Sequence, residues 1–238
     1  KECPWDRKQT HHSIKENLVE EAYEAVEAIE DEDHEELSKE LGDLLLHVVF
    51  HSKMADEESR FDIGDVIYRI SEKLIRRHPH IFSDTDVKDD KEVAENWESI
   101  KLSEGRDSIL DGIPAHLPGL IKAQRMQEKA SNVGFDWMEW TLAWEKLTEE
   151  INEWREAIES QTKAKQIEEF GDLLFSMVNV GRLLDVNAED AIRQANKKFN
   201  HRFRYIENRL KEQDRSFEET NLEEMDGYWN EAKKSDRL

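Results

Sequence analysis

Two stretches share one pattern: Leu18-Val19-Glu20-Glu21-Ala22-Tyr23-Glu24-Ala25-Val26-Glu27-Ala28-Ile29 and Leu147-Thr148-Glu149-Glu150-Ile151-Asn152-Glu153-Trp154-Arg155-Glu156-Ala157-Ile158. At the same separation, Glu40-Leu41-Gly42-Asp43-Leu44-Leu45 is matched by Glu169-Phe170-Gly171-Asp172-Leu173-Leu174. Agreement of both blocks at equal spacing indicates an internal repeat, in which each copy forms one structural unit.

Apolar residues in these blocks recur every three or four positions. In the second copy they form one stripe of Trp144, Leu147, Ile151, Trp154 and Ile158, and another of Ile167, Phe170, Leu174, Met177, Val178 and Gly181. This spacing is typical of amphipathic helices. The alternation of apolar and polar residues that marks half-buried strands is nearly absent. We therefore predict an all-α protein of two tandem helical domains, with these stripes buried.

Acidic residues flank the stripes in both copies. The second copy carries Glu150, Glu153, Glu169 and Asp172, and the first carries Glu21, Glu24, Glu40 and Asp43. If paired helices pack antiparallel, the acidic flanks meet, and like charges stay ionised together only around a cation. Oxygen ligands at helical spacing suit Mg²⁺, or alternatively Mn²⁺. We predict a metal site in the second copy and a second possible metal site in the first.

Composition narrows the class of partner. The 238 residues carry a formal net charge of −22, which argues against nucleic-acid polymers and anionic membrane surfaces. A nucleotide is still allowed, because a bound metal ion inverts the local field. Cys3 is the only cysteine, so no internal disulfide forms. With no signal peptide and no apolar run of transmembrane length, we expect a cytoplasmic protein.

Glycine and proline punctuate the region between the copies. The segment from Ser103 to Pro118 contains Gly105, Gly112, Pro114 and Pro118, residues that interrupt helices. We predict a first helical domain at 1–102, a linker at 103–118 and a second domain at 119–238.

At these residues the chain resembles the MazG family of nucleotide pyrophosphohydrolases. The resemblance covers nearly the whole chain and rests on the paired acidic motifs, on Cys3-Pro4-Trp5-Asp6, on Arg76-Arg77-His78-Pro79-His80-Ile81-Phe82, and on the basic and aromatic C-terminal segment. It implies an all-α bundle completed by a second subunit, hence a homodimer. It also implies hydrolysis of nucleoside triphosphates to nucleoside monophosphate and pyrophosphate, with broad tolerance of the base.

The resemblance also implies roles for individual residues. Glu150, Glu153, Glu169 and Asp172 match the family's metal ligands, and a second set matches its nucleotide-contacting positions: Lys146, Lys165, Lys198, Arg202, Trp229 and Lys233. Glu149 and Glu150 are the candidate general bases. We favour Trp229 for stacking on a base, and expect Trp137, Trp140 and Trp144 in the core or at an interface.

Other functions stay open at this point. A sister pyrophosphohydrolase dedicated to dUTP or phosphoribosyl-ATP would carry the same carboxylates, and a helical regulatory scaffold could hold structural metal ions. The copies also differ, because Asn17 and Glu36 in the first stand where Lys146 and Lys165 stand in the second. Loss of phosphate-facing cations predicts that the second copy performs most of the turnover.

Overall fold

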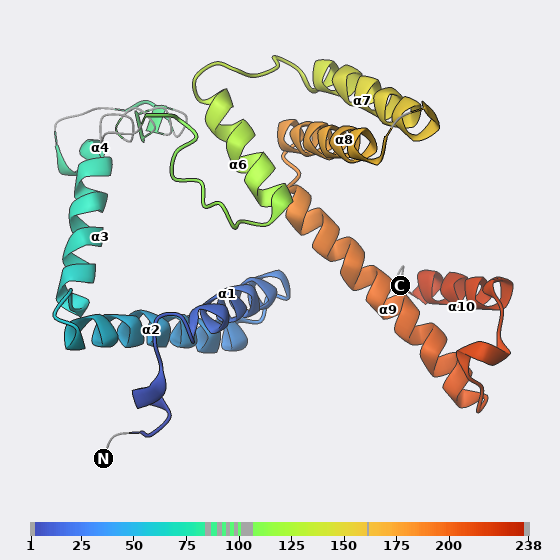
Figure 1. The fold of residues 1–238 in the computed structure, drawn as a ribbon, viewed down its shortest axis with the longest axis horizontal. Helices are drawn as coiled ribbons and strands as arrows, with labels where there is room; N and C mark the ends of the chain where they lie inside the picture. Colours follow the sequence, from blue (N-terminus) through green and yellow to red (C-terminus); the bar gives the residue numbers. More distant parts are fainter. Residues whose placement is uncertain are drawn as a thin grey trace. The chain divides into compact units, whose positions relative to one another are not determined.

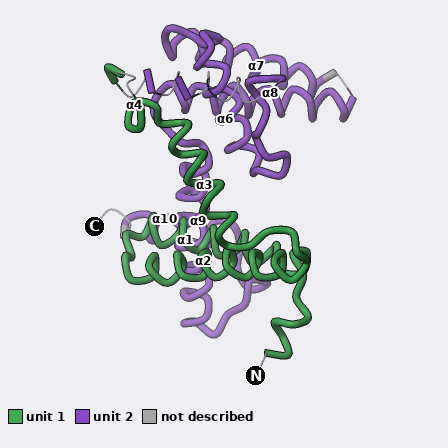
Figure 2. Tube along the Cα trace, turned by 90° about the vertical axis from the view of Figure 1, so that its left-hand side faces the viewer, with its two compact units in different colours: residues 1–89 green, residues 90–238 purple. Residues whose placement is uncertain are grey.

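A computed structural model describes residues 3–83, 87–89, 92–93, 96–97, 100, 107–160 and 162–235. The chain divides into two compact units, residues 1–89 and 90–238 (Figure 2). The predicted domain boundary, at residues 102 and 103, lies outside the described residues. No described helix is long and apolar enough to cross a membrane.

The first unit consists of helices. After the short helix η1 (Asp6–Lys8), α1 (Lys15–Glu30) and α2 (His34–Glu57) form an antiparallel pair, followed by α3 (Ile63–Arg77) and α4 (Pro79–Phe82) (Figure 1). The side chain of Asp33 caps α2 by accepting hydrogen bonds from the backbone nitrogens of Glu35 and Glu36. The short turn makes α1 and α2 antiparallel neighbours, and it brings Glu21 and Glu24 of α1 close to Glu40 of α2.

The second unit repeats this arrangement with additions. Its elements are α6 (Gly119–Ser131), α7 (Trp140–Ser160), α8 (Lys163–Leu183), α9 (Ala188–Glu212), η2 (Phe217–Glu219) and α10 (Leu222–Ser235). In Figure 1, α7 and α8 lie side by side, α6 packs against α8, and α10 folds back on α9. The prediction of an all-α fold is confirmed, since every regular element among the described residues is a helix.

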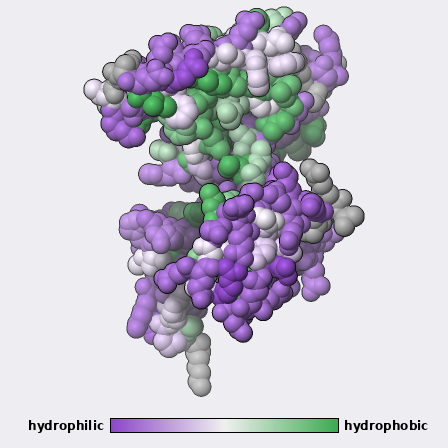
Figure 3. Space-filling view, turned by 90° about the vertical axis from the view of Figure 1, so that its right-hand side faces the viewer, coloured by the Kyte–Doolittle hydropathy of each residue, from purple (hydrophilic) through white to green (hydrophobic). Residues whose placement is uncertain are grey.

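The predicted buried stripes are largely wrong for the single chain. The α7–α8 pair packs instead through a narrower face of Ala143, Leu147, Leu173 and Val180. The broader stripes of large residues then point outward. Their exposed members are Trp144, Ile151, Ile158, Ile167, Phe170, Leu174 and Met177. Figure 3 shows apolar side chains at the surface of the upper part of the molecule, where these helices lie.

Candidate metal and nucleotide site

The second acidic cluster lies where α7 meets α8. Glu150 and Glu169 are only 5% and 6% exposed, and one oxygen of each lies within 4.8 Å of an oxygen of the exposed Asp172. Glu153, one turn further along α7, is exposed and stands outside this group. The structure therefore brings together three of the four predicted ligands, with the fourth at the edge.

The carboxylates of this cluster repel one another. Burial, followed by the charges of Glu150 and Glu169, raises the pKa of Asp172. Burial and the charge of Glu150 likewise raise the pKa of Glu153. A hard divalent cation relieves such repulsion and accepts carboxylate oxygens as ligands. The side chains present thus fit a magnesium or manganese ion.

Two lysines reach the buried carboxylates from one helical turn away. The Nζ atom of Lys146 lies 2.7 Å from a Glu150 oxygen and 3.1 Å from a Glu149 oxygen, and the Nζ atom of Lys165 lies 2.6 Å from a Glu169 oxygen. Hydrogen bonds to Glu150 and Glu169, respectively, raise the pKa of each lysine. The i, i+4 spacing within one helix sets these contacts. Two ammonium groups are therefore held beside the cluster, where a phosphate chain would need them.

The first acidic cluster has the same carboxylates but different surroundings. Glu21, Glu24 and Glu40 have oxygens within 4.8 Å of one another, whereas Asp43 is exposed and outside the group. Glu40 is 8% exposed, and its Oε2 atom has no hydrogen-bond partner among the described residues. Burial and then the charges of Glu24 and Glu21 raise the pKa of Glu40 to about 6.

One difference between the copies, besides Asn17 in place of Lys146, is an exchange of charge within one ion pair. In the first copy Lys39 Nζ lies 2.7 Å from Glu36, and in the second Lys165 Nζ lies 2.9 Å from Glu168. The pair has the same spacing in both helices, but the residue one turn before the buried glutamate is acidic in the first and basic in the second. The first cluster is consequently the more negative.

The other predicted nucleotide contacts lie on α9 and α10. The guanidinium carbon of Arg202 is 5.4 Å from the centre of the Trp229 ring, and the Phe199 ring lies 5.2 Å from that same ring. Lys198 and Lys233 are exposed on the same two helices. In Figure 1 this helix pair extends away from α7, and none of these four residues belongs to the acidic group or lines the cavity that Lys146 borders.

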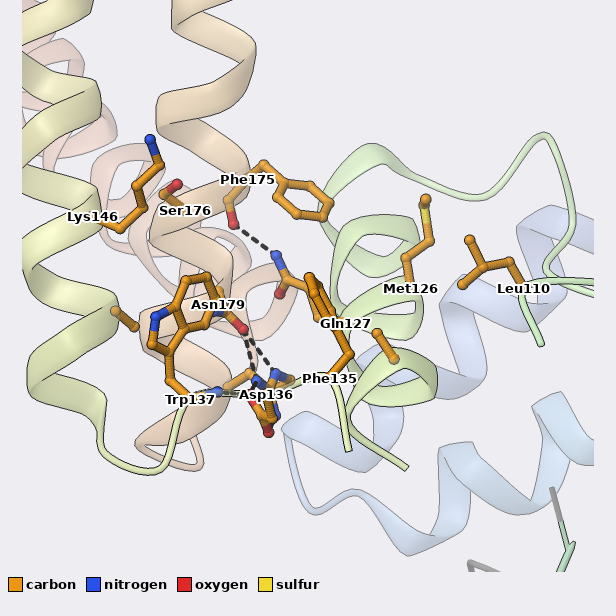
Figure 4. Close-up of a pocket in the computed structure, with 13 residues that line it drawn as sticks. Leu110, Met126, Gln127, Phe135, Asp136, Trp137, Lys146, Phe175, Ser176 and Asn179 are labelled. Carbon is orange, nitrogen blue, oxygen red and sulfur yellow. Dashed lines mark hydrogen bonds and ion pairs between the residues drawn. The ribbon is translucent and has the colours of Figure 1, made fainter. Parts of the chain in front are cut away.

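A cavity beside the cluster is lined by residues that the sequence did not indicate as site residues. Gln127, Asp136, Asn179 and Arg182 line it together with Lys146 (Figure 4). The sequence feature that could have pointed to this cavity is Asn179, a polar residue within the apolar run Val178-Asn179-Val180. Trp137, which was expected in the core or at an interface, is 41% exposed on the cavity wall and so lies outside the core of the single chain.

Comparison with known proteins agrees with this architecture. The family model described as "MazG nucleotide pyrophosphohydrolase domain" matches twice, at residues 9–82 and 141–206. A nucleoside triphosphate pyrophosphohydrolase/pyrophosphatase MazG of Thermotoga maritima is 45% identical over 98% of this chain and 90% of its own length.

Two further relatives match across almost the whole chain. A nucleoside triphosphate pyrophosphohydrolase of Escherichia coli K12 is 43% identical over 98% of this chain and 91% of its own length. The protein YabN of Bacillus subtilis is 45% identical over 99% of this chain but only 49% of its own length. With two acidic helix pairs, a doubly matched family model and such relatives, the chain belongs to the MazG family of nucleotide pyrophosphohydrolases.

Proposed function

We propose that this protein hydrolyses ribo- and deoxyribonucleoside triphosphates between the α and β phosphates, giving nucleoside monophosphate and pyrophosphate. The observation that carries this proposal is the acidic cluster on α7 and α8 with a lysine paired to each buried carboxylate. Carboxylates without a cation would repel a triphosphate, whereas carboxylates with a metal ion and two lysines attract it. The relatives named as nucleoside triphosphate pyrophosphohydrolases support the same substrate class.

Glu150, Glu169 and Asp172 would hold the metal ion, with Glu153 completing the set. Bound there, Mg²⁺ would supply the positive charge that stabilises the phosphoryl group under attack. Lys146 and Lys165 would hold phosphate oxygens beside it through charge-assisted hydrogen bonds. The carboxylates that would bind the metal ion and the lysines that would bind phosphate therefore lie on the same edge of the helix pair.

We assign proton removal to Glu149. This residue is exposed next to Glu150, and its carboxylate is not one of the three clustered ligands. Glu149 accepts a proton from water as the water oxygen bonds to the α phosphorus. The bond from that phosphorus to the bridging oxygen breaks, and pyrophosphate leaves with the electron pair. Glu150 is the other candidate base, but it is one of the three carboxylates that would hold the metal ion.

We also propose that the protein works as a homodimer. The exposed stripes on α7 and α8 include Ile158 and Ile167, 52% and 63% exposed, and surfaces of this kind normally pack against a partner. A second copy would bring its own Lys198, Arg202, Trp229 and Lys233 toward the cluster. Light scattering should give twice the chain mass of 28.1 kDa. A monomer at micromolar concentration would contradict this part of the proposal.

One experiment tests the reaction, and its products separate the alternatives. Purified protein is incubated with Mg²⁺ and each of ATP, dATP, CTP, GTP, UTP and dUTP, and the products are separated by anion-exchange chromatography. We expect monophosphate and pyrophosphate from several bases, and no turnover in excess EDTA. Diphosphate and orthophosphate would refute the cleavage position. Turnover of dUTP alone would favour the dedicated enzyme, and no turnover of any nucleotide would favour the scaffold.

We place the reaction in the cytoplasm, where these nucleotides are made and used.

A further inference from the structure

Three histidines of the first unit lie together outside the acidic clusters. His47 and His51 stand one turn apart on α2, and His11 belongs to the turn that precedes α1. The His51 ring stacks on the His11 ring with centres 5.0 Å apart, and the centre of the His47 ring lies 6.2 Å from that of His51. None of the three is part of either acidic group, so the proposed function gives them no role.

The turn that carries His11 is held by local hydrogen bonds. The backbone nitrogen of Thr10 donates to Ser13 Oγ at 2.9 Å, and the backbone nitrogen of Ser13 donates to Thr10 Oγ1 at 3.1 Å. Ser13 Oγ also donates to the side-chain oxygen of Gln9 at 2.7 Å. Ile14, which follows, is 2% exposed, so the end of the turn is anchored in the interior. The turn therefore fixes the position of His11 beside α2.

Hydrogen bonding selects one tautomer of His51. Its Nδ1 atom lies 2.7 Å from His11 Nδ1, so one of these two nitrogens donates a proton to the other. The Nε2 atom of His51 is buried and has no hydrogen-bond partner among the described residues. A buried N–H group without an acceptor is rarer in proteins than a buried acceptor without a donor. We therefore place the proton of His51 on Nδ1, which donates it to His11, and the lone pair on Nε2.

A second nitrogen without a partner lies one turn earlier on α2. His47 is 9% exposed, and in the part of the chain that the structure describes its Nδ1 atom has no hydrogen-bond partner. An unsatisfied buried polar atom destabilises the fold. A cation bound to both nitrogens would satisfy them together, and histidines at i and i+4 on one helix are a known pair of zinc ligands.

The separation of the two rings is close to that of two ligands on one metal ion. At a Zn–N distance of about 2.0–2.1 Å, two imidazoles on one zinc ion place their ring centres roughly 5–6 Å apart. The 6.2 Å between the centres of His47 and His51 lies just above this range, so side-chain rotation on one helix can close the difference. The hydrogen bond from His51 to His11 is of the kind that orients a ligating imidazole.

The chemistry of the ligands selects the ion. Imidazole nitrogen suits Zn²⁺, whereas Mg²⁺ prefers the carboxylate oxygens of the acidic clusters. Among the described residues no third His, Cys, Asp or Glu joins the two nitrogens in a group within 4.8 Å, so water would complete the coordination. A site with two protein ligands binds zinc more weakly than the closed sites that supply four.

We infer that His47 Nδ1 and His51 Nε2 form a binding site for Zn²⁺ in the first unit, and that His11 holds His51 in the tautomer that the ion requires. Through His11, the ion links α2 to the turn that precedes α1. The inference does not rest on the proposed function, because no residue of the acidic groups supplies a ligand.

Nitrogen NMR of histidine-labelled wild-type protein tests the site directly. In the metal-free protein we expect His51 to carry its proton on Nδ1. Zn²⁺ added in excess Mg²⁺, which keeps the acidic clusters occupied, should shift the resonances of His51 Nε2 and His47 Nδ1 and leave those of His12 unchanged. A proton on His51 Nε2 would overturn the inference. The absence of a shift at the two nitrogens would also overturn it, and would show that a water molecule satisfies them instead.

Calorimetry with Zn²⁺ in excess Mg²⁺ then assigns the ligands. His51→Phe keeps a ring at this position and should lose one bound ion per chain. His11→Phe keeps the stacked ring but not the hydrogen bond, and it should weaken that binding about ten-fold, as removal of an outer hydrogen-bond partner does at other metal sites. His12→Phe is the matched control, since His12 is the exposed neighbour of His11, and should bind Zn²⁺ as the wild type does.

Circular dichroism shows whether each variant retains its helices. Unchanged Zn²⁺ binding in folded His51→Phe or folded His11→Phe would overturn the inference. If a variant does not fold, the NMR result on the wild type decides. Hydrolysis of nucleotides is measured separately, and a protein without turnover would refute the proposed function while leaving the zinc site to be judged by binding alone.

Discussion

Exchanging one ion pair should convert the second acidic cluster into a likeness of the first. The double variant Lys165→Glu/Glu168→Lys leaves the net charge unchanged and retains a pair at i, i+3, as Glu36 and Lys39 form in the first copy. Helix propensity hardly changes, because Glu and Lys are nearly equal in helices. The exchange reverses the charge one turn before Glu169 and moves the positive charge to position 168, whose side chain is 61% exposed and therefore more strongly screened by solvent.

The structure sets the size of the expected effect. Lys165 Nζ lies 2.6 Å from Glu169, and a phosphate held by a metal ion on that carboxylate would lie roughly 5 Å from this ammonium group. A unit charge at about 5 Å in a medium of effective dielectric about 20 contributes about 3 kcal/mol. The lysine side chain is 37% exposed, and solvent screening reduces this to about 1 kcal/mol. The exchange changes two units of charge, so we expect about 2 kcal/mol, a roughly 30-fold lower kcat/KM.

Steady-state hydrolysis of ATP measures this loss, with circular dichroism and light scattering to confirm helicity and assembly. The matched control is Glu36→Lys/Lys39→Glu, which makes the same exchange in the first copy. We expect the control to leave kcat/KM within about two-fold of wild type, because turnover is assigned to the second copy. If the control variant lost activity and the Lys165 variant did not, the reasoning from phosphate-facing charge would be wrong and the first copy would be the catalytic one.

Three other perturbations have definite expected outcomes. In metal-free protein, Glu40 should hold its proton more tightly in the folded than in the unfolded state, because its folded pKa of about 6 exceeds the unfolded value. The free energy of unfolding should therefore fall as the pH rises from about 4.5 to 6.5. This fall should be smaller in Glu40→Gln. Urea titrations at several pH values measure this, and equal slopes in both proteins would contradict it. Gly171→Ala and Gly42→Ala should each stabilise the protein by about 1 kcal/mol, because a Cβ atom there meets nothing within 4 Å. A loss of stability in thermal melts would show that another chain covers the glycine. Ile167→Lys should yield monomers in light scattering, and a persistent dimer would remove this residue from the interface.

Local patterns were enough to predict the fold class and the acidic clusters. Spacing along one helix places Glu150 one turn after Lys146, and a helix repeats that geometry wherever it occurs. The short connection between the helices of each pair makes them antiparallel neighbours, so that motifs on facing flanks come together, as they do in both copies. Both steps use separations of a few residues, which a sequence displays directly.

The buried face of each helix pair was harder to predict. Apolar content favoured the stripe of large residues, but α7 and α8 meet through a different, narrower face that includes Ala143 and Leu173. Sequence alone does not say whether a large apolar stripe is covered by its own chain or by another. The cavity was unpredictable for a related reason. Gln127 meets Phe175 and Asp136 meets Arg182 across long separations, and no local pattern marks such pairs.

The proposed function gives the two lysines a role in each state of the second cluster. Glu150 and Glu169 are buried carboxylates, and without a cation each would destabilise the fold. Lys146 and Lys165 neutralise them in the metal-free chain, through the contacts seen here. A metal ion held by these carboxylates would neutralise them in turn, and the two ammonium groups would then be available to a triphosphate at the same edge. Glu40 has no such ammonium partner among the described residues, so the first cluster has a reason to bind a cation but no comparable means of holding phosphate.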